Sequence, residues 1–159
     1  PGVLGFDSPH SNRVILYDTK HGSADEKNWH VNAATILHEA THQVAFNTGL
    51  HNRAAPPPRW VGEGLAMLFE APGIWNPRRF KDAEDRINRK GLQAFRTLMP
   101  HRTQDSLARF VSQGVREFSS APSQSYAEAW AFTFFLSEQE PKRFAQYLKM
   151  KAAREPLRN

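Results

Sequence analysis

Two histidines enclose a glutamate in the segment His38-Glu39-Ala40-Thr41-His42. On a helix, residues four apart lie about 40° from each other and one turn along the axis, so both imidazoles can reach one metal ion. Glu39 lies about 100° round from His38, beside the ion and not among its ligands. A general base for a metal-activated water belongs there, so the motif predicts the chemistry of a zinc-dependent hydrolase.

The H-E-x-x-H pattern is unusual for a chain of this composition. With 7 histidines in 159 residues, random order would produce about 0.02 such matches. The alternative interpretation is a pair of core histidines that happen to flank a glutamate. The helical setting of the motif favours a metal site.

A catalytic zinc site needs a third protein ligand and one open position. Glu63 is the candidate, because it follows His42 by 21 residues and a loop between them can fold a second helix back on the first. Glycines flank it at 62 and 64, which indicates close helix packing at a cost of about 1 kcal/mol each. An exposed glutamate near a helix start is the alternative. The competing ligands are His30, His51 and His101, of which His51 is the strongest.

Helical periodicity predicts the elements that carry these residues. We expect one helix over about 28–48, ending at Gly49, and a second over 59–71. Later helices are expected over about 77–90, 103–113, 125–139 and 141–153. Ser125 and Glu128 predict a capping box that opens the third of these, and Pro141 suits the first position of the last.

The amino-terminal residues are rich in Val, Leu, Ile and aromatics, with Gly and Pro between them. They predict short strands with a turn near Ser8–Asn12, and Asn12–Asp18 is the best strand. We therefore expect one α+β domain over 1–159, with a small antiparallel sheet before a mainly helical remainder. In that remainder we expect a core behind the catalytic site, formed by Phe95, Phe110, Trp130, Phe134 and Phe135.

Composition narrows the classes of function. The chain has no cysteine, which excludes thiolate metal sites and cysteine nucleophiles, and no apolar run long enough to span a membrane. The net charge is +5, and its excess lies within residues 76–159. A nucleic-acid surface is one interpretation, but acidic residues alternate with the basic ones, which favours solvated helix faces.

Because the chain begins at Pro1 and its first methionine is Met67, we expect it to be a piece of a longer protein.

The two motifs together resemble the gluzincin metallopeptidases, above all the aminopeptidase-N-like enzymes. The resemblance rests on His38–Gln43 and on Trp60-Val61-Gly62-Glu63-Gly64-Leu65-Ala66 with Glu70, although the gap between them is about two residues longer here. A bacterial family of unknown function, predicted to be exported metallopeptidases, is more similar still. It shares Asn12–Tyr17 and Tyr126–Phe132 and covers most of the chain.

The resemblance assigns roles to particular residues. It implies Zn²⁺ bound by His38, His42 and Glu63, with Glu39 as the base. Tyr126 matches a tyrosine that opens a later helix and hydrogen-bonds the oxyanion, although an amphipathic residue at the rim of the core is equally consistent. Glu70 matches a carboxylate that orients a ligand, or is a surface glutamate.

The expected function is hydrolysis of peptide bonds in a peptide or protein substrate, within a compact gluzincin or thermolysin-like fold. The strand over 12–18 could offer an edge to an extended substrate. No Gly-x-Met-Glu-Asn-type segment precedes the zinc helix, so aminopeptidase specificity does not carry over. The family implies a periplasmic or extracellular location. The alternatives are an inactive zinc-binding or scaffolding module and, with less support, a basic nucleic-acid-binding domain.

Overall fold

The computed structural model describes residues 4–17 and 26–153, with the backbone alone described for 26–31 and 113–115. The chain starts with an antiparallel hairpin of β1 (Gly5–Ser8) and β2 (Arg13–Leu16), in which Phe6 pairs with Ile15. This confirms the small antiparallel sheet. Contrary to the prediction, the second strand does not include Asn12, because Asn12 adopts a left-handed conformation (φ 54°) in the turn, and the strand ends before Tyr17. Asp18, the last residue of the predicted strand, lies outside the described residues.

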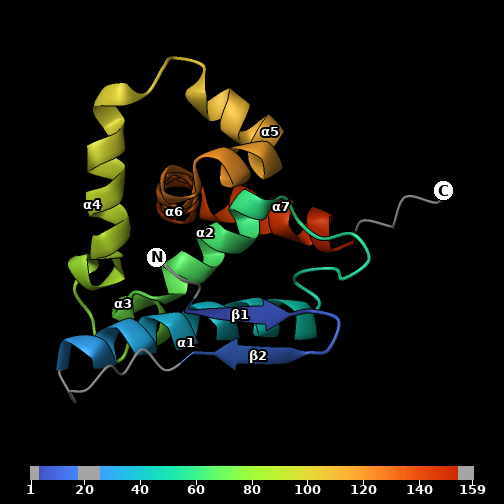
Figure 1. The fold of residues 1–159 in the computed structure, drawn as a ribbon, viewed down its shortest axis with the longest axis vertical. Helices are drawn as coiled ribbons and strands as arrows, with labels where there is room; N and C mark the ends of the chain where they lie inside the picture. Colours follow the sequence, from blue (N-terminus) through green and yellow to red (C-terminus); the bar gives the residue numbers. More distant parts are fainter. Residues whose placement is uncertain (1–3, 18–25, 154–159) are drawn as a thin grey trace.

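The hairpin packs against α1 (Glu26–Asn47), and α1 packs in turn against α2 (Arg59–Phe69). Figure 1 shows the hairpin and α1 lying together at one end of the molecule, with α2 next to them towards its middle. Both helices match the sequence prediction to within two residues. Gly49, just after α1, has φ 75°, the left-handed conformation that commonly follows a helix end.

The core lies where α2 packs against α5 (Ser106–Ser120) and α6 (Pro122–Gln139), with α7 (Pro141–Ala152) alongside. The buried cluster consists of aromatic and aliphatic side chains with one methionine: Trp60, Val61, Leu65, Met67, Leu68, Phe110, Phe118, Ala129, Trp130 and Phe144. Phe95 and Phe134 pack against the cluster as predicted. The prediction that Phe135 lies in the core is wrong, because the side chain projects from α6 with 55% of its surface exposed.

Gly64 allows the close approach of α2 to α6. A Cβ atom at this position would lie 2.7 Å from the carbonyl oxygen of Ala129. A Cβ at Gly62 would meet only ordinary contacts, 3.8 Å from the rings of His42 and His51. The close packing expected from the two glycines therefore holds for Gly64 alone.

The predicted helix over 77–90 is wrong. The structure has a short helix α3 (Pro72–Trp75), a 3-10 helix η1 (Ala83–Arg86) and then α4 (Arg89–Leu98), which helical periodicity did not predict. Local caps divide this stretch, because Asp82 forms a capping box for η1 and the side chain of Asn88 caps α4. α4 packs against α6.

The helix predicted over 103–113 runs instead over 106–120, and α6 begins at Pro122, three residues before the predicted start. The capping box of Ser125 and Glu128 is therefore wrong. Ser125 is buried within α6 and its backbone nitrogen bonds Ala121, while Glu128 pairs with Arg102 at 2.9 Å. Pro141 does occupy the first turn of α7. The result is a mostly helical α+β chain in which no described helix is long and apolar enough to cross a membrane.

Candidate metal centre

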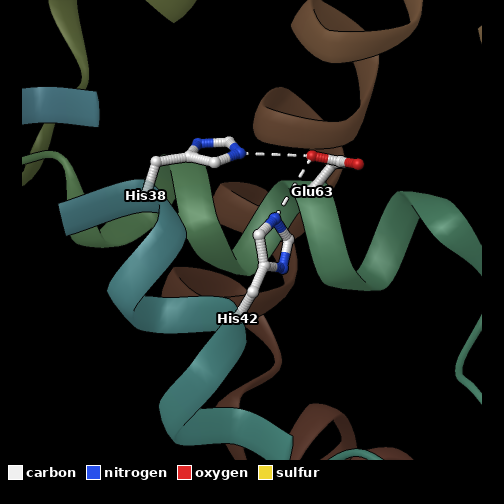
Figure 2. A group of neighbouring side chains, drawn as sticks. All are labelled: His38, His42 and Glu63. Carbon is white, nitrogen blue, oxygen red and sulfur yellow. Dashed lines mark hydrogen bonds and ion pairs between the residues drawn. The ribbon is translucent and has the colours of Figure 1, made fainter. Parts of the chain in front are cut away.

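The packing of α1 against α2 brings His38, His42 and Glu63 together (Figure 2). Oε2 of Glu63 lies 3.2 Å from Nε2 of His38 and 3.5 Å from Nε2 of His42. One ligand atom from each residue falls within 4.8 Å of the others, and no second group of this kind occurs among the described residues. Both histidines project from successive turns of α1 toward the carboxylate on α2, so this group could hold a metal ion.

The competing histidines do not join this group. His51 is only 4% exposed and packs edge-on against Phe46, and burial, with a smaller effect from His42, lowers its pKa to about 4. Within the described part of the chain, its Nε2 has no hydrogen-bond partner. His101 is exposed at the end of a 3-10 helix, η2 (Met99–His101). The side chain of His30 lies outside the described residues.

The His38 ring lies between two carboxylates. Its Nε2 faces Glu63, and its Nδ1 lies 2.8 Å from Oε1 of Glu70. Burial acts to lower the pKa of His38, but the hydrogen bonds with Glu63 and Glu70 outweigh it and raise the pKa to about 9. Burial would raise the pKa of Glu63, but its contacts with the two histidines hold it well below its usual range. The centre therefore favours positive charge.

Glu70 is the carboxylate that the resemblance associated with ligand orientation, and the structure places it directly behind His38. Asn88, which neither sequence motif includes, lies behind Glu70. Its Nδ2 lies 2.8 Å from Oε2 of Glu70 and 3.0 Å from the carbonyl oxygen of Met67. An asparagine at a helix start signals a cap, but no sequence pattern shows a contact across 18 residues.

Glu39 lies on α1 beside the histidines and is only 8% exposed. Burial raises the pKa of its carboxyl group, although His38, His42 and a hydrogen bond from the backbone of Asp7 act in the opposite direction. Its side chain lines a cavity that His38 also borders. Glu39 is thus separate from the three grouped side chains yet adjoins them.

The resemblance implied that Tyr126 opens a helix. In the structure Tyr126 is instead the fifth residue of α6. Its ring centre lies 6.3 Å from that of His38 and 5.4 Å from that of Phe118. Burial and the Glu63 carboxylate raise the pKa of its phenol, and Arg59 partly offsets them. The hydroxyl is therefore protonated at neutral pH, and it interacts with Glu63 and Arg59 at the edge of the cavity that Tyr126 lines.

The cavity has a volume of about 890 Å³ and is bordered by β1, α1, α4 and the start of α6. Its apolar lining includes Leu4, Ala34, Met67, Ile87, Ala94 and Ala127. Glu39, His38 and Tyr126 face it from two different helices. A buried acid, a histidine of the grouped set and a phenol therefore share one largely apolar space, as ligand sites commonly do.

One comparison with known proteins gives a match. The model of a family described as a protein of unknown function (DUF1570) matches residues 32–158, which include every residue of the centre described above. No curated protein and no solved structure matches the chain.

Proposed function

The chain belongs to the DUF1570 family of proteins of unknown function, and we propose that it is a zinc-dependent peptidase. The observation that carries the proposal is the grouping of His38, His42 and Glu63 beside the buried Glu39. Three ligands, a separate buried acid and a neighbouring cavity are the components of a hydrolytic zinc site. The arrangement of a histidine helix against a glutamate helix supports a compact gluzincin fold.

The donor set fits zinc. Two imidazole nitrogens and one carboxylate oxygen make a His₂Glu set, the kind that leaves a fourth position open in catalytic sites. Glu70 supports this choice, because a carboxylate on Nδ1 of His38 leaves Nε2 to point at the ion. When bound, zinc would supply a Lewis acid that polarises a peptide carbonyl and makes a water more acidic.

Glu39 would act as the proton carrier. Its carboxylate accepts the proton of the attacking water and passes it to the amine that leaves as the peptide bond breaks. Burial raises the pKa of Glu39, which makes it a stronger base than an exposed glutamate. Tyr126 would donate a hydrogen bond to the carbonyl oxygen as negative charge develops there.

Peptide binding would use the cavity and the hairpin. Leu4 and Gly5 line the cavity, so β1 and not the predicted strand over 12–18 lies beside it. An extended peptide can pair with a strand through main-chain hydrogen bonds, and the apolar lining would receive its side chains. The periplasmic or extracellular location remains a proposal that rests on the family resemblance alone.

The test is peptide hydrolysis by the zinc-loaded chain and its Glu39→Gln variant. We expect about one zinc per chain in both, with turnover of a peptide library falling at least about 100-fold in the variant because the base is lost. Glu140→Gln, a change of the same kind far from the cavity, should retain full turnover. Full turnover in Glu39→Gln would overturn the mechanism.

The same experiment distinguishes the peptidase from the inactive module. A chain that binds zinc but cleaves nothing would be the inactive zinc-binding or scaffolding module. The nucleic-acid alternative has less support, because several arginines engage carboxylates: Arg59 with Glu63, Arg86 with Glu138 and Arg102 with Glu128.

A further inference from the structure

Asn88 is the residue immediately before α4, and only 6% of it is exposed. Every polar atom of its side chain is engaged. Oδ1 accepts a hydrogen bond from the backbone nitrogen of Gly91 at 2.9 Å, and Nδ2 donates to Met67 and Glu70. Asn88 therefore joins the start of α4, the end of α2 and the carboxylate behind the metal centre.

These contacts continue to a grouped histidine. Oε2 of Glu70 accepts from Asn88 at 2.8 Å, and its other oxygen lies 2.8 Å from Nδ1 of His38. Because both oxygens of Glu70 are held, the plane of the carboxylate is fixed and with it the ring of His38. The opposite nitrogen, Nε2, then faces Glu63 at 3.2 Å.

We propose that Asn88 is a positioning residue for the metal centre. By donating to Glu70 it holds that carboxylate in the orientation that accepts the Nδ1 proton of His38, which keeps Nε2 of His38 available to the ion. The inference rests on the proposed zinc binding and adds to it a residue outside both sequence motifs.

Capping alone does not account for an asparagine at this position. A cap needs only the oxygen that accepts from Gly91, and aspartate, serine or threonine supply one equally well. The amide nitrogen is what distinguishes asparagine, and it is used on Met67 and Glu70. The neighbouring Arg89, Lys90 and Gly91 line the cavity, so the same side chain also ties a cavity wall to the centre.

The experiment separates the donor from the cap. Asn88→Asp retains the capping oxygen but replaces the donor with an oxygen that repels Glu70. We measure zinc affinity by competition with a chromophoric chelator at pH 8, and the unfolding midpoint of the metal-free protein. We expect affinity to fall about tenfold, as it does when an outer partner of a ligand is lost. Electrostatic attraction between the added negative charge and zinc would by itself raise the affinity. A fall in affinity therefore cannot come from the added charge attracting zinc.

A rescue tests the chain of contacts directly. Glu70→Gln alone should also weaken zinc binding about tenfold, because the carboxylate on His38 is lost. In the double variant Glu70→Gln/Asn88→Asp, the oxygen of the introduced amide can face His38, and its nitrogen can donate to the introduced carboxylate. We therefore expect the double variant to bind at least threefold more tightly than the product of the single losses predicts.

Asn88→Ser guards against misfolding of the aspartate variant, since serine caps well and carries no added charge. It should lose affinity to a similar extent, whereas the matched change Asp82→Ser at the cap of η1 should not. Unchanged affinity in both Asn88 variants, or losses that simply multiply in the double variant, would overturn the inference. A parent chain that binds no zinc would instead overturn the proposed function on which it rests.

Discussion

Oε2 of Glu63 lies 3.5 Å from Nε2 of His42, although the two residues stand on different helices and 21 positions apart. The contact exists because α2 packs between α1 and α6, and Gly64 lets α2 approach α6 closely. The glutamate is thereby held by core packing on one side and directed at the histidines on the other. Side chains held in this way need little rearrangement to bind an ion, which would favour affinity.

Glu63→Ala should remove most bound zinc, because two histidines alone leave the ion without its third protein ligand. Elemental analysis of the purified variant measures this, with the parent expected to hold about one zinc per chain. His51→Gln is the matched control and should retain zinc, since His51 does not join the grouped side chains. If His51→Gln loses zinc and Glu63→Ala keeps it, the assignment of the third ligand is wrong.

Tyr126→Phe should lower kcat about 100-fold or more and leave zinc content unchanged, because the phenol donates to developing charge and not to the ion. Steady-state kinetics on a cleaved peptide measures the effect, and KM should change little. Tyr147→Phe removes a hydroxyl from a tyrosine that stacks on Trp60 in the core and serves as control. Equal kcat values for parent and Tyr126→Phe would exclude Tyr126 from catalysis.

The helices that carry the centre can be predicted from local sequence, whereas the centre itself can be predicted only in part. Apolar periodicity and Gly49 predict α1 to within two residues, because a long amphipathic segment with a stop signal is locally encoded. Ligand spacing predicted Glu63 as the partner of the histidines, but the packing that delivers it depends on α6. Sequence spacing does not show which helix face meets which.

The errors have local causes. Residues 77–90 are rich in charged residues, as an exposed helix would be. The side chains of Asp82 and Asn88, however, bond the backbone that follows them and divide the segment. The cap at Asn88 could have been predicted from its residue type. Its second role could not, because the partner Glu70 lies 18 residues earlier and only the packing of α4 brings them together.

Gly64→Ala should destabilise the metal-free protein by about 1–3 kcal/mol, because its Cβ would lie 2.7 Å from the carbonyl oxygen of Ala129. Gly62→Ala supplies the matched comparison, since its Cβ meets only ordinary contacts and alanine favours a helix by up to about 1 kcal/mol. Urea unfolding of both variants measures the difference. If the two changes lower the free energy of unfolding equally, the close contact of α2 with α6 does not require a glycine at position 64.

Acid should destabilise the metal-free chain partly through His51. Burial keeps its pKa at about 4 in the folded chain, against 6.5 for an ordinary histidine. Between those values the unfolded chain binds the proton and the folded chain does not, so the free energy of unfolding falls as pH decreases from 6.5 to 4. A proton that only the unfolded chain binds changes the free energy of unfolding by about 1.4 kcal/mol per pH unit.

His51→Gln removes this contribution, so its stability should depend less steeply on pH than that of the parent between pH 4 and 6.5. Urea unfolding at a series of pH values, with a chelator present, gives both slopes. The comparison uses slopes because glutamine also alters packing against Phe46. His101→Gln, a change at an exposed position, serves as the control for losing a histidine. Equal slopes in the parent and His51→Gln would show that His51 takes up its proton equally in the folded and unfolded chains.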